Sequence, residues 1–187
     1  MMVLFRVLVL LLLAISGIVH SNIGLQNTLD RIVEKSTVPL KFVEIHSETS
    51  FTDEIRITGK MLFTAEGVMK KYIFTPKKSE AYIVGNVLTL IEKGEKREIS
   101  LLNYPIIASS INAIRWLLSG DKDKILDNYF IEYSEQSNGW KLELTPKYED
   151  ILSEISSILI IGHLGYIDTI KLIKSDDTSI LTTFSRL

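Results

Sequence analysis

The sequence contains 187 residues, of which 46% are hydrophobic and 24% are charged, and it has no cysteine. This length suits one domain, and the balance of apolar and charged residues excludes a disordered or low-complexity chain. The lack of cysteine excludes disulfide frameworks, zinc fingers, iron–sulfur clusters, thiol nucleophiles and lipid attachment through a cysteine. The formal net charge of −2 argues against a nucleic-acid-binding protein, for which a basic surplus is expected.

The first segment has the pattern of a secretory signal peptide. Arg6 supplies a positive charge and is followed by an apolar run that ends before His20. This run is about thirteen residues long, whereas a membrane-spanning helix needs roughly twenty, so an uncleaved membrane anchor is the less favoured alternative. We predict cleavage after Ser21. The chain then consists of a signal peptide, residues 1–21, and a single mature domain, residues 22–187, which is exported and soluble.

The mature chain begins with a helical pattern and continues with short strands. Residues 22–34 place their apolar side chains on one stripe, as an amphipathic helix does. Beyond Pro39, alternating or compact apolar runs predict strands, and turn residues such as glycine and asparagine separate them. The predicted strands are Leu40–His46, Glu54–Thr64, Val68–Phe74, Glu80–Val84, Val87–Ile91 and, after a turn at 92–96, Glu98–Leu101.

The period then changes to that of a helix. Ile107, Ile111, Ile114 and Leu118 fall on one helical face, which predicts a helix that starts near Pro105. Gly120 ends this helix, Asp121 caps a second helix that runs to about Asn128, and Lys147–Glu154 is a short helix or a turn. The remaining predicted strands are Phe130–Tyr133, Trp140–Thr145, Ile155–Ile161, Tyr166–Lys174 and Ser179–Ser185.

These elements predict an α+β fold that is mainly β, with about ten antiparallel strands. Many short strands joined by hairpins favour an open, strongly bent antiparallel sheet or incomplete barrel over a parallel α/β fold. The amphipathic helices are then expected to form a helical lid over the apolar concave face. Such a sheet encloses either a packed core or a lipid-sized apolar cavity, and the residues alone leave both open.

The sequence lacks a recognisable catalytic or metal-binding pattern. His46 is interpreted as a surface strand residue, and His163 lies in an expected turn, so the two give no metal-ligand spacing. There is no G-x-S-x-G elbow, glycine-rich phosphate loop or H-E-x-x-H motif. The acidic pairs at Asp121-Lys122-Asp123 and Asp176-Asp177 are explained by capping and turn formation. We therefore predict no catalytic residue, no metal site and no cofactor, and we expect that the protein is not an enzyme.

Basic side chains cluster in the first group of strands. They are Lys70, Lys71, Lys77, Lys78, Lys93, Lys96 and Arg97. The favoured interpretation is the solvated side of edge strands, where lysine also discourages pairing between sheets. The alternative is a docking strip for an acidic partner or a membrane surface.

The order of elements and several local motifs resemble the LolA-like family of periplasmic outer-membrane lipoprotein carriers. The motifs are Gly59–Phe63, Tyr72–Pro76, Ile83–Leu88 and, as the strongest, the strand Asn138–Lys147 that ends in Leu-Thr-Pro-Lys. Ser119–Asp121 with Tyr129-Phe130 further resembles a LolA-related branch found beside lipid and polyene biosynthesis genes. The resemblance covers nearly all of residues 22–187.

The resemblance implies a periplasmic carrier that holds the acyl chains of a lipoprotein or free lipid in an apolar cavity and moves this cargo towards the outer membrane. It further implies an inner-membrane donor transporter and an outer-membrane receptor as partners, and we expect a monomer that binds no nucleic acid. Residues 105–119 are the expected lid. The lipid-binding residues that we predict are Ile57, Met61, Phe63, Met69, Ile73, Ile107, Ile111, Ile114, Leu118, Trp140, Leu142 and Leu144.

One departure from the family concerns how the lid is held closed. The proteobacterial carrier has an arginine before the turn between its second and third strands, and alignment on Pro76 places Ala65 or a neighbour there. This leaves the closure latch and the identity of the cargo open, so a glycolipid or a polyene-lipid precursor is as plausible as a lipoprotein. The alternatives are a lipoprotein-sensing module like the RseB regulators, whose additional C-terminal domain we do not expect here, and an accessory hydrolase or acyltransferase.

Overall fold

The computed structural model describes residues 24–47, 54–64 and 66–187. The predicted signal peptide, residues 1–21, lies outside these ranges. The first described element is a helix over residues 24–35, in agreement with the predicted amphipathic helix. The strands are β1 (Leu40–Ser47), β2 (Ile55–Phe63), β3 (Met69–Thr75), β4 (Ser79–Val84), β5 (Val87–Glu92), β6 (Glu95–Ser100), β7 (Tyr129–Gln136), β8 (Gly139–Pro146), β9 (Ile155–His163), β10 (Tyr166–Lys174) and β11 (Ser179–Arg186). The helices after β6 are η1 (Leu101–Asn103), α2 (Pro105–Ser119), α3 (Lys122–Asn128) and, between β8 and β9, α4 (Glu149–Leu152).

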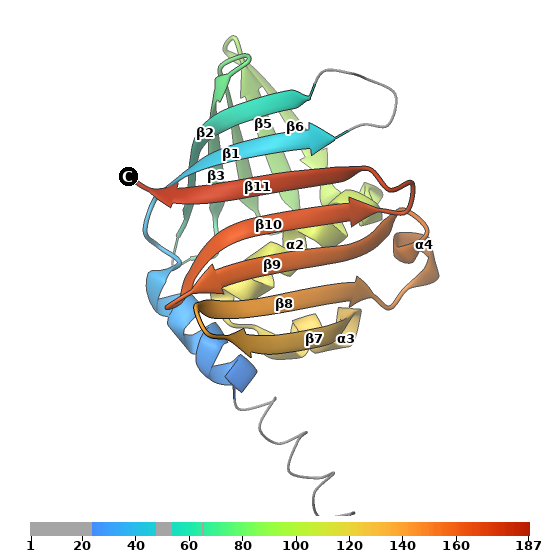
Figure 1. Ribbon diagram of the computed structural model, residues 1–187. Helices are drawn as coiled ribbons and strands as arrows, with labels where there is room; N and C mark the ends of the chain where they lie inside the picture. The colour runs from blue at the N-terminus through green and yellow to red at the C-terminus, as the bar shows by residue number, and fades with distance from the viewer. Residues whose placement is uncertain (1–23, 48–53, 65) are drawn as a thin grey trace, which may run out of the picture.

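All eleven strands belong to one antiparallel sheet with the order β6-β5-β4-β3-β2-β1-β11-β10-β9-β8-β7. Most neighbours in the sheet are also neighbours in sequence, because short connections favour hairpins. The exception is the pairing of β1 with β11, in which Leu40 lies opposite Arg186 and Ser47 lies opposite Ser179. Figure 1 shows that the sheet curls strongly but stays open, with β6 and β7 as its edges. The predicted fold class is therefore confirmed.

One connection places a helix on the concave side of the sheet. Strands β6 and β7 follow each other in sequence but lie at opposite edges, so residues 101–128 must cross the molecule. They cross on the concave side (Figure 1). Helix α2 begins at Pro105 and ends at Gly120, whose φ of 70° is left-handed and therefore favours glycine. Asp121 then caps α3 by accepting a hydrogen bond from the backbone amide of Lys124 at 3.3 Å, as the sequence predicted.

Strand β6 is longer than predicted. The sequence suggested a turn at 92–96 followed by a strand from Glu98, whereas the structure turns within Lys93-Gly94 and starts β6 at Glu95. Lys93 and Gly94 both have positive φ values, 53° and 84°. A two-residue turn of this kind matches the twist of a hairpin and needs no longer loop.

The core lies between the concave face and the helices that cover it. Strands β8 and β9 contribute side chains that are at most 1% exposed, and α2 and the helix at 24–35 cover them. These side chains are Leu142, Leu144, Ile158 and Ile160 from the sheet, Ala113 and Leu117 from α2, and Leu29 and Ile32 from the first helix. Full burial of each large aliphatic side chain stabilises the fold by about 1.5–3 kcal/mol relative to exposure. Within the described ranges, none of the helices has the length and hydropathy needed to span a bilayer.

Candidate functional site

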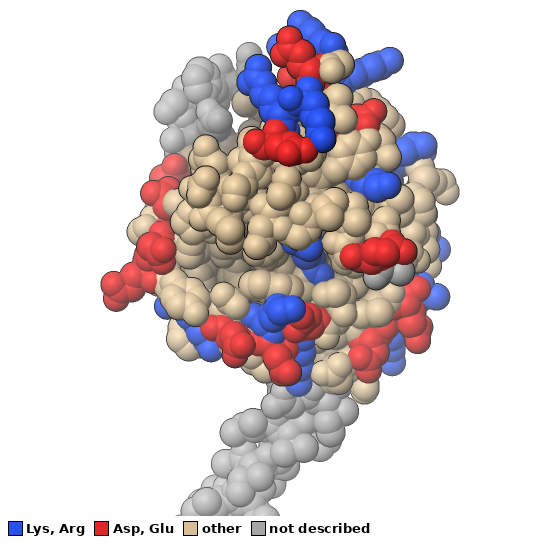
Figure 2. All heavy atoms as spheres, turned by 180° about the vertical axis from the view of Figure 1, so that it is seen from behind, with Lys and Arg blue, Asp and Glu red and all other residues tan. Residues whose placement is uncertain are grey.

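The concave face presents every second side chain of each strand to α2. On β2 and β3, Phe63 lies opposite Met69 and Met61 lies opposite Lys71, so these four side chains share this face. The alternation continues through β8, where the even-numbered residues are buried and the odd-numbered ones are half-buried. Figure 2 shows the side of the molecule opposite to that of Figure 1. Uncharged residues surround a hollow there, and most acidic and basic side chains lie towards the periphery.

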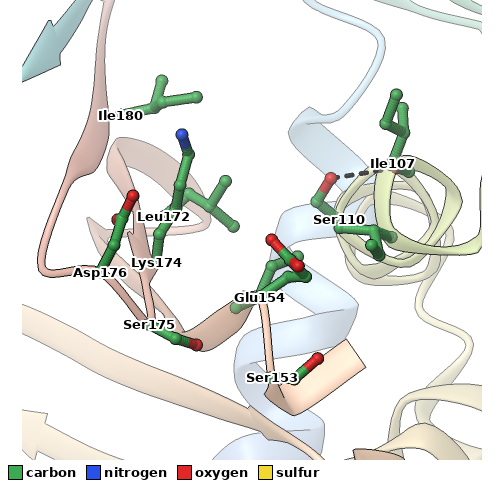
Figure 3. Close-up of a pocket in the computed structure, with 11 residues that line it drawn as sticks. Ile107, Ser110, Ser153, Glu154, Leu172, Lys174, Ser175, Asp176 and Ile180 are labelled. Atoms are coloured by element: carbon green, nitrogen blue, oxygen red, sulfur yellow. Dashed lines mark hydrogen bonds between the residues drawn. The ribbon is translucent and has the colours of Figure 1, made fainter. Parts of the chain in front are cut away.

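A cavity of about 680 Å³ lies between α2 and the ends of β9, β10 and β11 near α4. Ile107 and Ser110 of α2 face Leu172 of β10 and Ile180 of β11 across this space (Figure 3). The other lining residues are Ile106, Ser153, Glu154, Ile155, Lys174, Ser175 and Asp176. The volume falls within the range of about 300–1,000 Å³ that is common for small-molecule sites. The cavity therefore combines an apolar wall with charged groups, in the arrangement that an amphiphilic ligand requires.

Two further spaces adjoin α2. One is a hollow of about 320 Å³ on the other side of the helix, against η1 and α4, with a mixed polar and apolar lining. Between α2 and the helix at 24–35, an apolar gap of only about 30 Å³ is lined by Met61, Ile114 and Leu118 among others. Such a gap holds no acyl chain, so access to the interior beyond the 680 Å³ cavity requires α2 to move.

Polar contacts of two side chains, Arg115 and Tyr129, attach α2 to opposite halves of the sheet. The Arg115 guanidinium donates to the carbonyl oxygen of Gly85 at 2.6 Å and lies 3.5 Å from that of Gly67, so it reaches the turns after β4 and β2. On the other half, the Tyr129 hydroxyl at the start of β7 donates to the carbonyl oxygen of Ser109 at 3.0 Å. Burial raises the pKa of Tyr129. Helix α2 thus bridges the two arms of the open sheet.

These contacts bear on the latch that the sequence left open. Ala65, the position at which a latch arginine was sought, lies outside the described residues. An arginine on the lid itself, Arg115, contacts the turns of the sheet instead. Its Nε is buried and has no hydrogen-bond partner in the described part of the chain.

A charged cluster interrupts the apolar concave face. The Glu44 carboxylate on β1 lies 2.6 Å from the Lys71 ammonium and 2.8 Å from Nε2 of His46, and the Thr182 hydroxyl is 3.4 Å from it. The Lys71 ammonium also lies 4.6 Å from the centre of the Phe42 ring, which is in the core. Burial alone would raise the pKa of Glu44, but the Lys71 ammonium and the His46 ring outweigh this effect and hold that pKa below its usual range. We call Glu44, His46 and Lys71 the charged cluster.

The charged cluster corrects two interpretations made from the sequence. His46 was interpreted as a surface strand residue and Lys71 as part of a solvated edge, yet both side chains are only 27% exposed and bind Glu44. Both lie on the strand face that points to the core. Of the remaining basic residues, Lys96 and Arg97 lie on the exposed edge strand β6 and pair with Glu98 and Glu95.

The predicted lipid-binding residues fall into four groups. Ile107 lines the 680 Å³ cavity, whereas Met61, Ile114 and Leu118 line the small apolar gap. Phe63 lines a shallow hollow beside Arg115. The others pack within or against the core, and they are Ile57, Met69, Ile73, Ile111, Trp140, Leu142 and Leu144. Their role in binding cargo stays a prediction.

The described residues hold few groups arranged for chemistry. Nδ1 of His163 lies 2.6 Å from the Asp168 carboxylate, but this pair is more than one-third exposed and lies away from the cavity lining. Within residues 24–47, 54–64 and 66–187, no three histidine, aspartate or glutamate side chains gather closely enough to hold a metal ion. The arrangement under α2 is suited to binding an amphiphile.

The fold class of this protein is an open antiparallel sheet that curls round a covering helix. Comparison with protein families identifies the family to which the chain belongs. Residues 19–178 match the family described as "Outer membrane lipoprotein carrier protein LolA-like", so the chain belongs to this family. Comparison with curated protein sequences gives no match.

Solved structures show a similar fold at low sequence identity. A chain of the MucA/MucB complex of Pseudomonas aeruginosa has a TM-score of 0.50 and 10% identity, over 87% of this chain and 56% of that chain. A LolA superfamily protein from Nitrosomonas europaea has a TM-score of 0.46 and 11% identity, over 86% and 90%. The lipoprotein LppX of Mycobacterium tuberculosis has a TM-score of 0.45 and 9% identity, over 88% and 95%. At these identities the likeness concerns the fold alone.

Proposed function

We propose that this protein is a periplasmic carrier that binds the acyl chains of a lipoprotein or lipid beneath α2 and moves this cargo towards the outer membrane. The observation that carries the proposal is the cavity of about 680 Å³ between α2 and β9–β11. Its apolar wall continues directly into the concave face that α2 and the helix at 24–35 cover. Membership of the LolA-like family supports the same function.

Binding in this site would be driven by removal of the acyl chain from water. Each buried methylene contributes about 0.8 kcal/mol, so a long chain gains a large free energy even when only part of it is enclosed. Ile107 is 49% exposed, and covering it would add to this gain. The cargo therefore enters at the cavity and extends inward as α2 moves.

Release requires that the covering helix can open. Helix α2 is held by buried side chains such as Leu117 and by the polar contacts of Arg115 on one arm of the sheet and Tyr129 on the other. The strand pairing of the eleven-stranded sheet does not involve α2, so the helix can move while the sheet stays intact. An inner-membrane donor transporter and an outer-membrane receptor are the partners expected to load and unload the cargo, which is bound without catalysis.

A fluorescent fatty acid tests the proposed site. The Ile107→Glu variant places a carboxylate against the cavity at a half-exposed position, so we expect the affinity for the fatty acid to fall at least about tenfold while the fold persists. The matched control is Ile161→Glu, an isoleucine on the outer face of β9 that is 37% exposed. This variant should bind as the wild type does. Equal affinity in all three proteins would refute the site, and no binding by the wild type would refute the carrier function.

A further inference from the structure

The charged cluster is unusual because it lies on a face that otherwise serves the apolar core. Glu44 is 12% exposed, and Lys71 reaches it across the ring of the core residue Phe42. Burial of an ion pair carries a desolvation penalty that often exceeds the attraction between its charges, and apolar residues of similar size frequently give a more stable fold. Stability alone therefore gives little reason for this cluster.

The hydrogen bonds within the cluster leave donors unused. Both oxygens of Glu44 are occupied, one by His46 and the other by Lys71 with Thr182 nearby. An ammonium group has three donors, and among the described residues Glu44 is the one hydrogen-bond acceptor recorded for Lys71. Glu44 balances the charge of Lys71, so the capacity that remains is that of N–H donors on a side chain that is 27% exposed, and a carboxylate or phosphate oxygen is a strong acceptor for them.

The cluster is continuous with the wall of the 680 Å³ cavity. Leu172 lies opposite Ile180 in the pairing of β10 with β11, and Ile180 lies opposite His46 in the pairing of β11 with β1. Side chains directly opposite each other on one face of a sheet are about 4.5–5.5 Å apart at Cβ. Since Leu172 and Ile180 both line the cavity, the cluster lies one strand further along the same wall. The charged residues of the lining itself are Lys174, on the same strand as Leu172, and the carboxylates Glu154 and Asp176.

We propose that the cargo bears an anionic group, a carboxylate or a phosphate, close to its acyl chain, and that the Lys71 ammonium binds this group beside the cavity. Glu44 is a positioning residue, because it holds the Lys71 side chain over the apolar floor. The inference rests on the proposed carrier function and specifies the class of cargo.

Amphiphiles with the same chain and different head groups test the inference. Palmitate, hexadecyl phosphate and neutral hexadecanol compete with a fluorescent probe for the full chain at mildly alkaline pH, with inorganic phosphate alone as a further arm. We expect both anions to bind at least about tenfold more tightly than the alcohol, as one charge-assisted hydrogen bond allows. The Lys71→Met variant should lose this preference and keep its affinity for hexadecanol. The Lys70→Met control, whose ammonium lies near the Tyr82 ring on the outer face, should retain it.

Each outcome bears on a different claim. Equal affinity of the wild type for all three amphiphiles would overturn the anionic site and leave the carrier function standing, whereas no binding of any would remove both. Displacement of hexadecyl phosphate by an equal concentration of inorganic phosphate would also overturn it, since the site would then recognise a free anion. If Lys71→Met does not fold, Lys71→Gln gives a second measurement. An unchanged preference in a folded variant of Lys71 contradicts the assignment.

Discussion

Replacing Arg115 with methionine removes the polar contacts between α2 and the turns at Gly67 and Gly85. A hydrogen bond from a charged donor contributes about 1.5–3 kcal/mol. The 3.5 Å contact with Gly67 adds little to this value. The substitution also removes the buried Nε, which has no hydrogen-bond partner among the described residues, and this offsets part of the loss. We therefore expect the closed position of α2 to be destabilised by about 1–2 kcal/mol. This corresponds to roughly a 5–30-fold larger open population. Amide hydrogen exchange measures it directly, since α2 should exchange faster while β8 is unchanged.

The matched control for this experiment is Arg97→Met. The Arg97 side chain on β6 is 78% exposed and lies 3.8 Å from Glu95, so its loss should leave α2 unaffected. Exchange of α2 at the wild-type rate in Arg115→Met would refute the view that this arginine holds the helix. Uniform acceleration across α2 and β8 would assign the contact to global stability instead.

Two further predictions concern the sheet beneath the lid. Glu44→Gln should lower the free energy of unfolding at neutral pH by about 1–3 kcal/mol. Because the pKa of Glu44 is lowered by its partners, its stabilising contribution is complete above the ordinary value of 4.5 and is lost as pH falls through the lowered value. Urea titrations should therefore show the two proteins converging in acid, and parallel curves would contradict the assignment. Gly59→Ala should destabilise the fold by about 2 kcal/mol or more, because its Cβ would meet the Phe42 ring at 2.7 Å and the Tyr72 carbonyl oxygen at 2.0 Å. A thermal midpoint equal to the wild type would show that the strands adjust.

The sequence predicted the order of the elements because local signals specify them. Alternation identifies β2 and β8, and the Gly120-Asp121 pair both ends α2 and caps α3. The lid on the concave side also follows from helices placed between groups of strands. The start of β6 was predicted wrongly, because the glycine and the charged residues at 92–96 are compatible both with a five-residue turn and with the two-residue turn that forms.

The charged cluster was missed although a local signal for it exists. Met69 and Ile73 were assigned to the cavity, and period-two alternation puts Lys71, which lies between them, on the same face. The contact of Lys71 on β3 with Glu44 on β1 spans two strand pairings and uses the long reach of lysine, which no local pattern encodes. The partners of Arg115 are backbone carbonyls of distant turns and leave no trace in the side-chain pattern.

The central claim is that an acyl-bearing ligand occupies the space beneath α2 in the cell. Native mass spectrometry of the protein purified from the periplasm, followed by lipid extraction, tests this claim most directly. We expect a bound species whose mass matches an acylated molecule, which is displaced by palmitate and is reduced in Ile107→Glu but not in Ile161→Glu. A protein that is isolated free of acylated molecules and does not take up palmitate in vitro would contradict the account.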